Sequence, residues 1–164
     1  MTNHSTIGKH TSQQQFLVSI SWDYQNIPNA KLAQNLLLFA TSLGYVVNRK
    51  VYDNWEMKNK TITEIFGKLG FECINVSQRI KNAVDFYLFG DCCAEAASSV
   101  YPQIFIIVSG DCYCELLIDK LQAKGKKVIV FARKGNERKT LENKADKFYF
   151  LEDLPKLPIA YGVS

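Results

Sequence analysis

The sequence predicts a three-layer α/β/α domain with a mostly parallel central sheet. Short apolar segments rich in β-branched residues alternate along the chain with segments whose apolar residues recur every three or four positions. This alternation is typical of a parallel sheet with helices on both faces and right-handed crossovers. The chain has 164 residues, 47% of them hydrophobic, which suits one core and is too short for two ordinary domains.

The strands are expected where apolar runs end at polar turns. Residues 16–20 (FLVSI) precede the polar turn at residues 23–29 and predict the first strand. Residues 104–108 (IFIIV) are the clearest buried strand, so a central place in the sheet is expected for them. The full set of expected strands is 16–20, 45–52, 71–76, 104–108, 127–132 and, at an edge, 148–151.

The helices lie between these strands. Proline suits a first helical turn, so Pro28 followed by apolar residues at helical spacing predicts a helix that stops at Gly44. Further helices are expected at residues 62–69, 83–100 and 114–124, and in a charged segment before the last strand. The domain is assigned to residues 16–153, residues 1–15 to a disordered polar arm without the apolar core of a signal peptide, and residues 154–164 to a C-terminal tail.

Composition limits the class of protein only weakly. The net charge of +4 fits a nucleic-acid partner but also fits many other proteins. The five cysteines lack the C-x-x-C spacing of zinc sites, which indicates reduced, mostly buried thiols of a cytoplasmic protein. No apolar run approaches the roughly 20 residues that cross a bilayer, so no membrane partner is expected.

Three acidic residues follow the strands and helices in a way that predicts a metal site. Asp23 comes just after the first strand, Asp85 opens a helix, and Asp111 comes just after the central strand. In a parallel sheet these positions meet beyond the carboxyl ends of the strands. Crowded carboxylates bind hard cations, so Asp23, Asp85 and Asp111 are interpreted as ligands for Mg²⁺ or Mn²⁺.

Three neighbouring residues extend this site. Asn26 is placed to orient a water or a phosphate oxygen through its amide. Ser109 and Gly110, with the N–H groups that open the next helix, are placed to cradle a phosphate. Each of these residues also has an ordinary alternative role: Asn26 in a turn, Ser109 and Gly110 in a strand-to-helix turn, Asp111 as a helix cap, Asp85 beside a helix dipole. Only their combination favours a metal site.

Several segments in order resemble one known family. Residues 22–28 (WDYQNIP) resemble the W-D-x-E-N-x-x-P opening of limkain-type NYN domains, in the PIN-like nuclease superfamily. Residues 81–91 resemble their K-x-x-D-x-x-L-x-x-D element, and residues 107–111 their strand ending in S-G-D. Residues 125–128 and 145–148 resemble the closing G-x-x-V and A-D-x-F segments. The resemblance covers residues 16–153 and implies a metal-dependent nuclease fold that acts on RNA, with Lys81 as a phosphate partner.

Two positions depart from the family pattern. Tyr113 stands where a second metal-binding aspartate is expected, and Gln25 replaces a glutamate. A neutral phenol is a poor ligand for Mg²⁺, so one metal position is expected to be weakened or lost. Glu115 lies two residues further on, about 200° around a helix, and is a poor substitute. Asp91, about 120° around the helix from Asp85, is expected to have a secondary or structural role.

The leading hypothesis is therefore a metal-dependent endoribonuclease whose partner is RNA, with a homodimer as a further option. The alternative is a catalytically weakened RNA-binding or scaffold domain, which Tyr113 and Gln25 favour. A third reading, a nucleotide- or small-molecule-binding doubly wound domain, has little support, because neither G-x-G-x-x-G nor G-x-x-x-x-G-K-[ST] occurs.

Overall fold

The central feature of the protein is a single six-stranded sheet. A computed structural model describes residues 15–77, 79–135 and 138–158, so most of the expected N-terminal arm lies outside the described residues. The strand order is β3-β2-β1-β4-β5-β6, and every neighbouring pair is parallel. The strands are β1 (Leu17–Asp23), β2 (Tyr45–Asp53), β3 (Glu72–Asn75), β4 (Ile104–Val108), β5 (Lys127–Ala132) and β6 (Lys147–Phe150).

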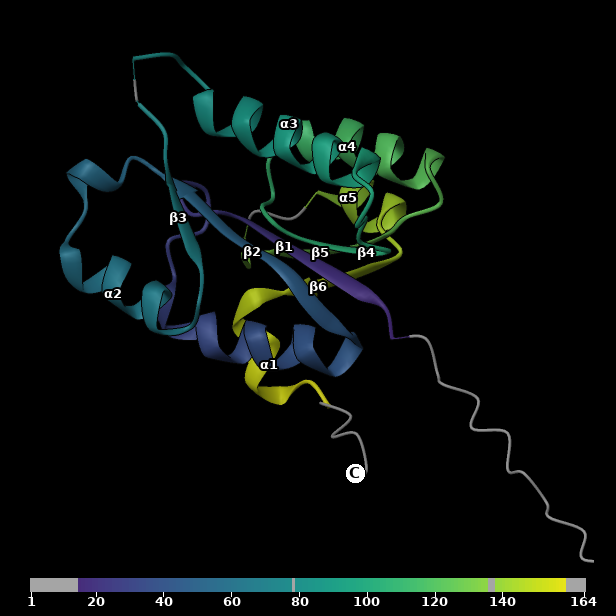
Figure 1. Ribbon diagram of the computed structural model, residues 1–164, viewed down its shortest axis with the longest axis horizontal. Coiled ribbons are helices and arrows are strands. Elements are labelled where there is room, and N and C mark those ends of the chain that lie inside the picture. Colours follow the sequence, from purple (N-terminus) through teal and green to yellow (C-terminus); the bar gives the residue numbers. More distant parts are fainter. Residues whose placement is uncertain (1–14, 78, 136–137, 159–164) are drawn as a thin grey trace, which may run out of the picture.

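Helices cover both faces of this sheet, which confirms the predicted three-layer α/β/α class (Figure 1). On one face lie α1 (Ala33–Leu43), α2 (Lys60–Lys68) and the short helix η3 (Leu151–Lys156); on the other lie α3 (Ala83–Ala97), α4 (Tyr113–Ala123) and α5 (Lys139–Lys144). The short helices η1 (Ala30–Leu32) and η2 (Trp55–Met57) follow β1 and β2. Each face has its own apolar core. Among the described residues, none of these helices has the length and apolar character to span a membrane.

Most element boundaries agree with the sequence analysis to within a few residues. The strands β4 and β5 have the predicted bounds. The first strand is longer than predicted and runs to Asp23, because Ser21 and Trp22 pair with both β2 and β4. The third helix is shorter than predicted and ends at Ala97. All five cysteines are free; Cys92 and Cys114 are buried, whereas Cys112 is exposed.

The strand order determines where a site can form. The chain leaves β1 toward α1 on one face and leaves β4 toward α4 on the other face. At such a switch point the outgoing connections diverge and leave a crevice beyond the carboxyl ends of the two strands. Asp23 is the last residue of β1, and Asp111 follows β4 by three residues. Both acids therefore lie beyond the carboxyl ends of β1 and β4, at this switch point.

Candidate metal centre

The strand β1 has a polar face and an apolar face. Side chains alternate along a strand, so every second residue faces α3. These residues are Ser19, Ser21 and Asp23, all of them buried. The residues between them pack in the apolar core on the side of α1 and α2. The alternation of LVSISWD thus directs the Asp23 carboxylate to the same side of the sheet as α3.

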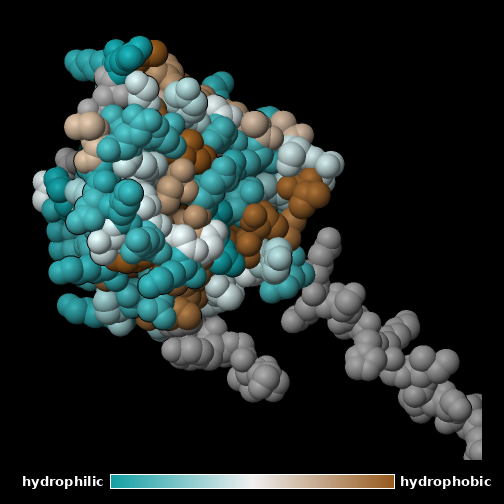
Figure 2. Space-filling model, turned by 60° about the vertical axis from the view of Figure 1, so that its left-hand side comes forward, coloured by the Kyte–Doolittle hydropathy of each residue, from teal (hydrophilic) through white to brown (hydrophobic). Residues whose placement is uncertain are grey.

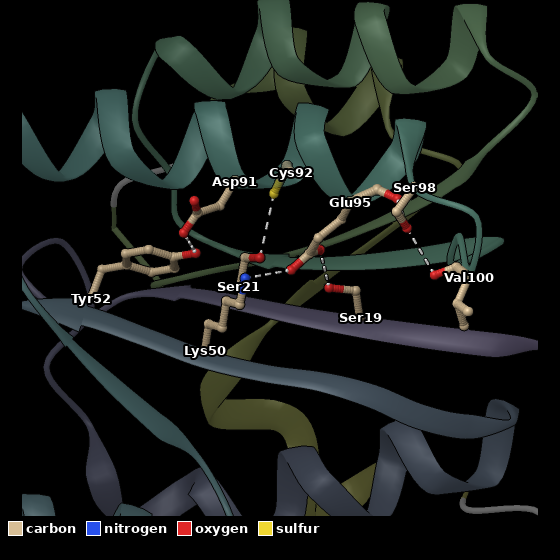
Figure 3. A network of polar contacts seen from close by, with 9 residues as sticks. All are labelled: Ser19, Ser21, Lys50, Tyr52, Asp91, Cys92, Glu95, Ser98 and Val100. Carbon is tan, nitrogen blue, oxygen red and sulfur yellow. Dashed lines mark hydrogen bonds and ion pairs between the residues drawn. The ribbon is translucent and has the colours of Figure 1, made fainter.

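The helix α3 lies over this polar face in a register that brings Asp85 to Asp23. At one end, the Ser19 hydroxyl donates to Glu95 at 2.6 Å (Figure 3). From Glu95 back to Asp85 the helix spans ten residues, or about 15 Å. From Ser19 forward to Asp23 the strand spans four residues, or about 13 Å. The two lengths match, so the contact at Glu95 carries Asp85 to the end of β1.

Three further polar contacts hold α3 in this register (Figure 3). All of them join α3 to β1 or β2. They are the Cys92 thiol donating to Ser21 at 3.3 Å, the Tyr52 hydroxyl donating to Asp91 at 2.7 Å, and the ion pair of Lys50 with Glu95 at 3.0 Å. Burial and the bond to Asp91 raise the pKa of the Tyr52 phenol, which keeps it a donor. Asp91 therefore has the structural role expected for it.

The structure brings the three predicted acids together. One carboxylate oxygen from each of Asp23, Asp85 and Asp111 lies within 4.8 Å of the other two. The three residues come from the end of β1, the first turn of α3 and the connection from β4 to α4. Their sequence positions are far apart, so this cluster depends on the register of α3 and on the strand order.

Burial and mutual repulsion act on these carboxylates. Asp23 is 1% exposed, and burial, with the charges of Asp111 and Asp85 added, raises its pKa from 3.8 to about 6. Two donors oppose this shift: the Asn26 N–H at 3.1 Å and the Tyr113 hydroxyl at 3.2 Å. The pKa of Asp85 is also raised, by burial and by Asp111.

This donor set fits a hard divalent cation. It offers carboxylate oxygens only, the ligand type that Mg²⁺ and Mn²⁺ prefer. A cation would relieve the repulsion that raises the pKa of Asp23, because an opposite charge favours the ionised form. The residues that would hold it are Asp23, Asp85 and Asp111.

Asn26 holds the two acidic loops together. Its side-chain Nδ2 donates to Asp111 at 3.0 Å, and its Oδ1 accepts from the Gly110 N–H at 2.8 Å. Both ends of the amide thus engage the loop after β4. The expectation that Asn26 orients a water or phosphate stays a prediction; the contacts observed make it a positioning residue for Asp111.

The Ser109 side chain connects the same loop to Asp23. Its hydroxyl donates to Asp23 at 3.3 Å and accepts from the Asp111 N–H at 3.3 Å. The Ser109 N–H donates to the Phe131 carbonyl. Ser109 and Gly110 were expected to cradle a phosphate together with the N–H groups that open α4. The N–H groups of Ser109 and Gly110 themselves donate to Phe131 and Asn26, and the phosphate cradle stays a prediction.

Tyr113 takes part in the centre as a hydrogen-bond donor. Burial raises the pKa of its phenol well above the ordinary value, so it stays protonated and donates to the Asp23 carboxylate at 3.2 Å. Glu115 does not replace the missing carboxylate, because it accepts from the hydroxyl of Thr140 in α5.

The structure bears on two of the ordinary alternatives, namely Asp111 as a helix cap and Asp85 beside a helix dipole. The residue that caps α4 is Cys112, which makes no side-chain capping bond, and Asp111 precedes it. The Asp111 carboxylate instead accepts from the Asn26 amide, so its side chain does not cap α4. Asp85 does lie in the first turn of α3, where the helix dipole favours a negative charge. That location does not compete with a role in the cluster.

Lys81 is exposed and lies two residues before α3. It lines a pocket that also includes Gln25, a residue of the turn after β1. Figure 2 turns forward the side of Figure 1 on which β1 and β2 end. Its surface is mainly hydrophilic, with hydrophobic residues in small separate patches. This side of the molecule thus has the polar character expected of a surface that receives a charged ligand.

Sequence reasoning missed the polar contacts beneath α3. The signal was present in the alternation S-I-S-W-D of β1, which leaves serines facing a helix. Ser19, Ser21, Lys50 and Glu95 do not contact the cluster, yet they determine the position of Asp85.

Comparison with known proteins agrees with this geometry. Residues 17–152 match the NYN domain family. The chain therefore belongs to the NYN domain family and has a PIN-like, nuclease-type fold. A crystal structure of a protein of unknown function from Vibrio parahaemolyticus RIMD 2210633 has the same fold, with a TM-score of 0.74 and 24% sequence identity over 88% of this chain and 98% of that chain. No curated protein matches the sequence.

Proposed function

We propose that this protein is a metal-dependent endoribonuclease, with RNA as the substrate and Mg²⁺ or Mn²⁺ as the cofactor. The observation that carries the proposal is the convergence of three carboxylates, one oxygen from each within 4.8 Å of the others, at the switch point of a PIN-like fold. NYN domains generally act on RNA, and this chain is a member of that family.

Each residue of the site has a defined role in this proposal. Asp23, Asp85 and Asp111 hold the cation, which when bound lowers the pKa of a water and offsets charge on a phosphodiester. Asn26 and Ser109 hold Asp111 and Asp23 in place through the bonds described above. The Gly110 N–H ties the loop after β4 to the Asn26 side chain. Lys81, exposed at the rim, is the phosphate partner.

A second candidate function is an RNA-binding NYN domain with weak or no catalysis. The contact that favours it is the Tyr113 hydroxyl bond to Asp23, because a phenol occupies a position where the family pattern has an acid. A neutral phenol supplies no charge to a second cation. Both candidates share RNA as the partner, so catalysis separates them.

The experiment is an RNA cleavage assay with Mn²⁺ on single-stranded RNA. We expect the wild type to cut and Asp23→Asn to lose activity. Asp119→Asn is the matched control, since it removes one carboxylate from the exposed side of α4. Cutting by Asp23→Asn at the wild-type rate would exclude this centre as the site of catalysis.

Tyr113→Asp distinguishes the two candidates. It restores a carboxylate beside Asp23, so a faster cutting rate would indicate that the natural chain works with an incomplete set of ligands. RNA binding by the wild type without cleavage under all metal conditions would favour the binding domain. A homodimer and a cytoplasmic location stay predictions of the sequence.

A further inference from the structure

A polar pocket of about 440 Å³ opens beside the carboxylate cluster. It is lined by residues from the turn after β1, the end of β2 and its following loop, and the connection from β3 to α3. The polar residues of the lining are Gln25, Asp53, Lys58, Ser77, Lys81 and Asn82. A volume of this size is within the range of pockets that hold small organic ligands.

The pocket shares two elements with the metal centre. Gln25 lies in the same turn as Asp23 and Asn26, and Asn82 comes three residues before Asp85. The pocket is therefore the neighbouring site that a polymer bound at the cluster would meet.

A buried carboxylate fixes one lysine on the pocket wall. Asp53 is 0% exposed; its Oδ1 accepts from the Asn54 N–H at 2.7 Å, and its Oδ2 lies 3.3 Å from the Lys58 ammonium. An ammonium has three donors, so Lys58 retains donors for a ligand after it pairs with Asp53. Its side chain is already ordered, which lowers the entropy that a ligand loses on binding.

The rest of the lining complements a nucleotide. Lys81 makes no ion pair with any residue in the described part of the chain, so its charge is available to a phosphate. Gln25 and Asn82 are exposed amides, and an amide can both donate to and accept from the edge of a base. Ser77 adds an exposed hydroxyl.

Asn82 also has an uncommon backbone conformation. Its φ is 60°, the only positive φ of a non-glycine residue in the described ranges, and its side chain makes no capping bond to α3. Left-handed residues of this kind are frequent at ligand sites. The Asn82 amide, which makes no capping bond to α3, lines the pocket wall.

We propose that this pocket is a nucleotide subsite for single-stranded RNA, which holds the unit next to the phosphodiester at the metal centre. The proposal rests on the proposed function, since it takes RNA as the ligand. A base that has left the stack can enter a pocket, whereas the bases of a duplex are paired and stacked. The lysines contact the phosphate, and the two amides contact the base.

Two exposed residues provide the test. Gln25→Glu adds a negative charge to the pocket with almost no change of shape, and Lys81→Gln removes a positive charge. Because both side chains are exposed, neither change disturbs the core. Lys58 is left intact, since its loss would leave the buried charge of Asp53 without its ion-pair partner. Lys127→Gln is the control, because Lys127 is exposed at the amino end of β5, whereas the pocket lies beyond the carboxyl ends of β1 and β2.

The measurement is the fluorescence anisotropy of a short labelled single-stranded RNA, with Ca²⁺ in place of Mg²⁺. We expect Lys81→Gln to weaken binding about fivefold at 0.1 M salt and to lower the slope of log K against log salt by about 0.7, the value for one phosphate contact on a single strand. Gln25→Glu should weaken binding at least as much. Lys127→Gln should bind as the wild type does.

Wild-type affinity in both pocket variants, or the same loss in Lys127→Gln, would overturn the subsite. Equal binding of a duplex of the same sequence would also overturn it. A failure of the proposed function has a different result: the wild type would not cut RNA, yet Gln25→Glu and Lys81→Gln would still weaken binding.

Discussion

The charge of Asp23 should make the metal-free protein less stable as the pH rises. Burial and two neighbouring acids raise its pKa from 3.8 to about 6. Between these two values the folded chain keeps a proton that the unfolded chain has released. The free energy of unfolding therefore falls with rising pH in this window and is constant above it, as far as Asp23 contributes.

The magnitude follows from the shift. A difference of about 2.2 pKa units corresponds to about 3 kcal/mol, of which about 2 kcal/mol arise between pH 4.5 and pH 7.5. Asp23→Asn removes this pH-dependent cost. The variant also loses part of the acceptor capacity that serves Asn26, Ser109 and Tyr113, at about 1 kcal/mol per bond, but that loss does not vary with pH.

The assay is urea unfolding in the presence of a chelator at several pH values. The free energy of unfolding of Asp23→Asn minus that of the wild type should increase by about 2 kcal/mol from pH 4.5 to pH 7.5. Asp119→Asn, on the exposed side of α4, corrects for the loss of one negative charge. A difference that stays flat over this range would refute the raised pKa of Asp23.

Four other substitutions test separate features of the structure. Tyr113→Phe removes a donor to Asp23, so the pKa of Asp23 should rise further. The affinity for Mn²⁺, measured by calorimetry at pH 7, should fall about tenfold. An unchanged affinity would contradict the role of Tyr113. Lys50→Met leaves Glu95 without its ion-pair partner and should lower the free energy of unfolding in urea by about 3 kcal/mol. An unchanged free energy of unfolding would show that other contacts hold α3. Gly44→Ala places a Cβ 2.2 Å from the Phe16 carbonyl oxygen and should lower the stability of the folded protein by about 1–3 kcal/mol in thermal melts. Gly67→Ala lies in open space on α2 and should instead raise that stability by about 0.5–1 kcal/mol.

The fold was predictable because local patterns and topology agree. The apolar runs of β4 and β5 are bounded by turns, so their residue bounds could be predicted directly. The alternation of strand and helix then required parallel strands, and parallel strands gather their carboxyl ends at one edge. This gathering of the carboxyl ends is enough to predict that Asp23 and Asp111 lie near each other.

The details of the site were less accessible to sequence reasoning. The position of Asp85 depends on where α3 lies along β1, which side-chain contacts between Glu95 and Ser19 determine. Ser109 and Gly110 were expected to help cradle a phosphate, but the Gly110 N–H donates to a side chain 84 positions away. Long-range contacts of this kind leave no periodic signal in the chain. The pairing of Asp53 with Lys58 is close in sequence, yet only the burial of Asp53 reveals that this lysine is held on a pocket wall.

Anomalous diffraction from crystals soaked in Mn²⁺ would test the metal centre most directly. The account predicts one strong manganese peak within bonding distance of oxygens from Asp23, Asp85 and Asp111, and loss of that peak in Asp111→Asn. A map of the wild type with no peak between these three carboxylates, at a manganese concentration that saturates binding in solution, would contradict it.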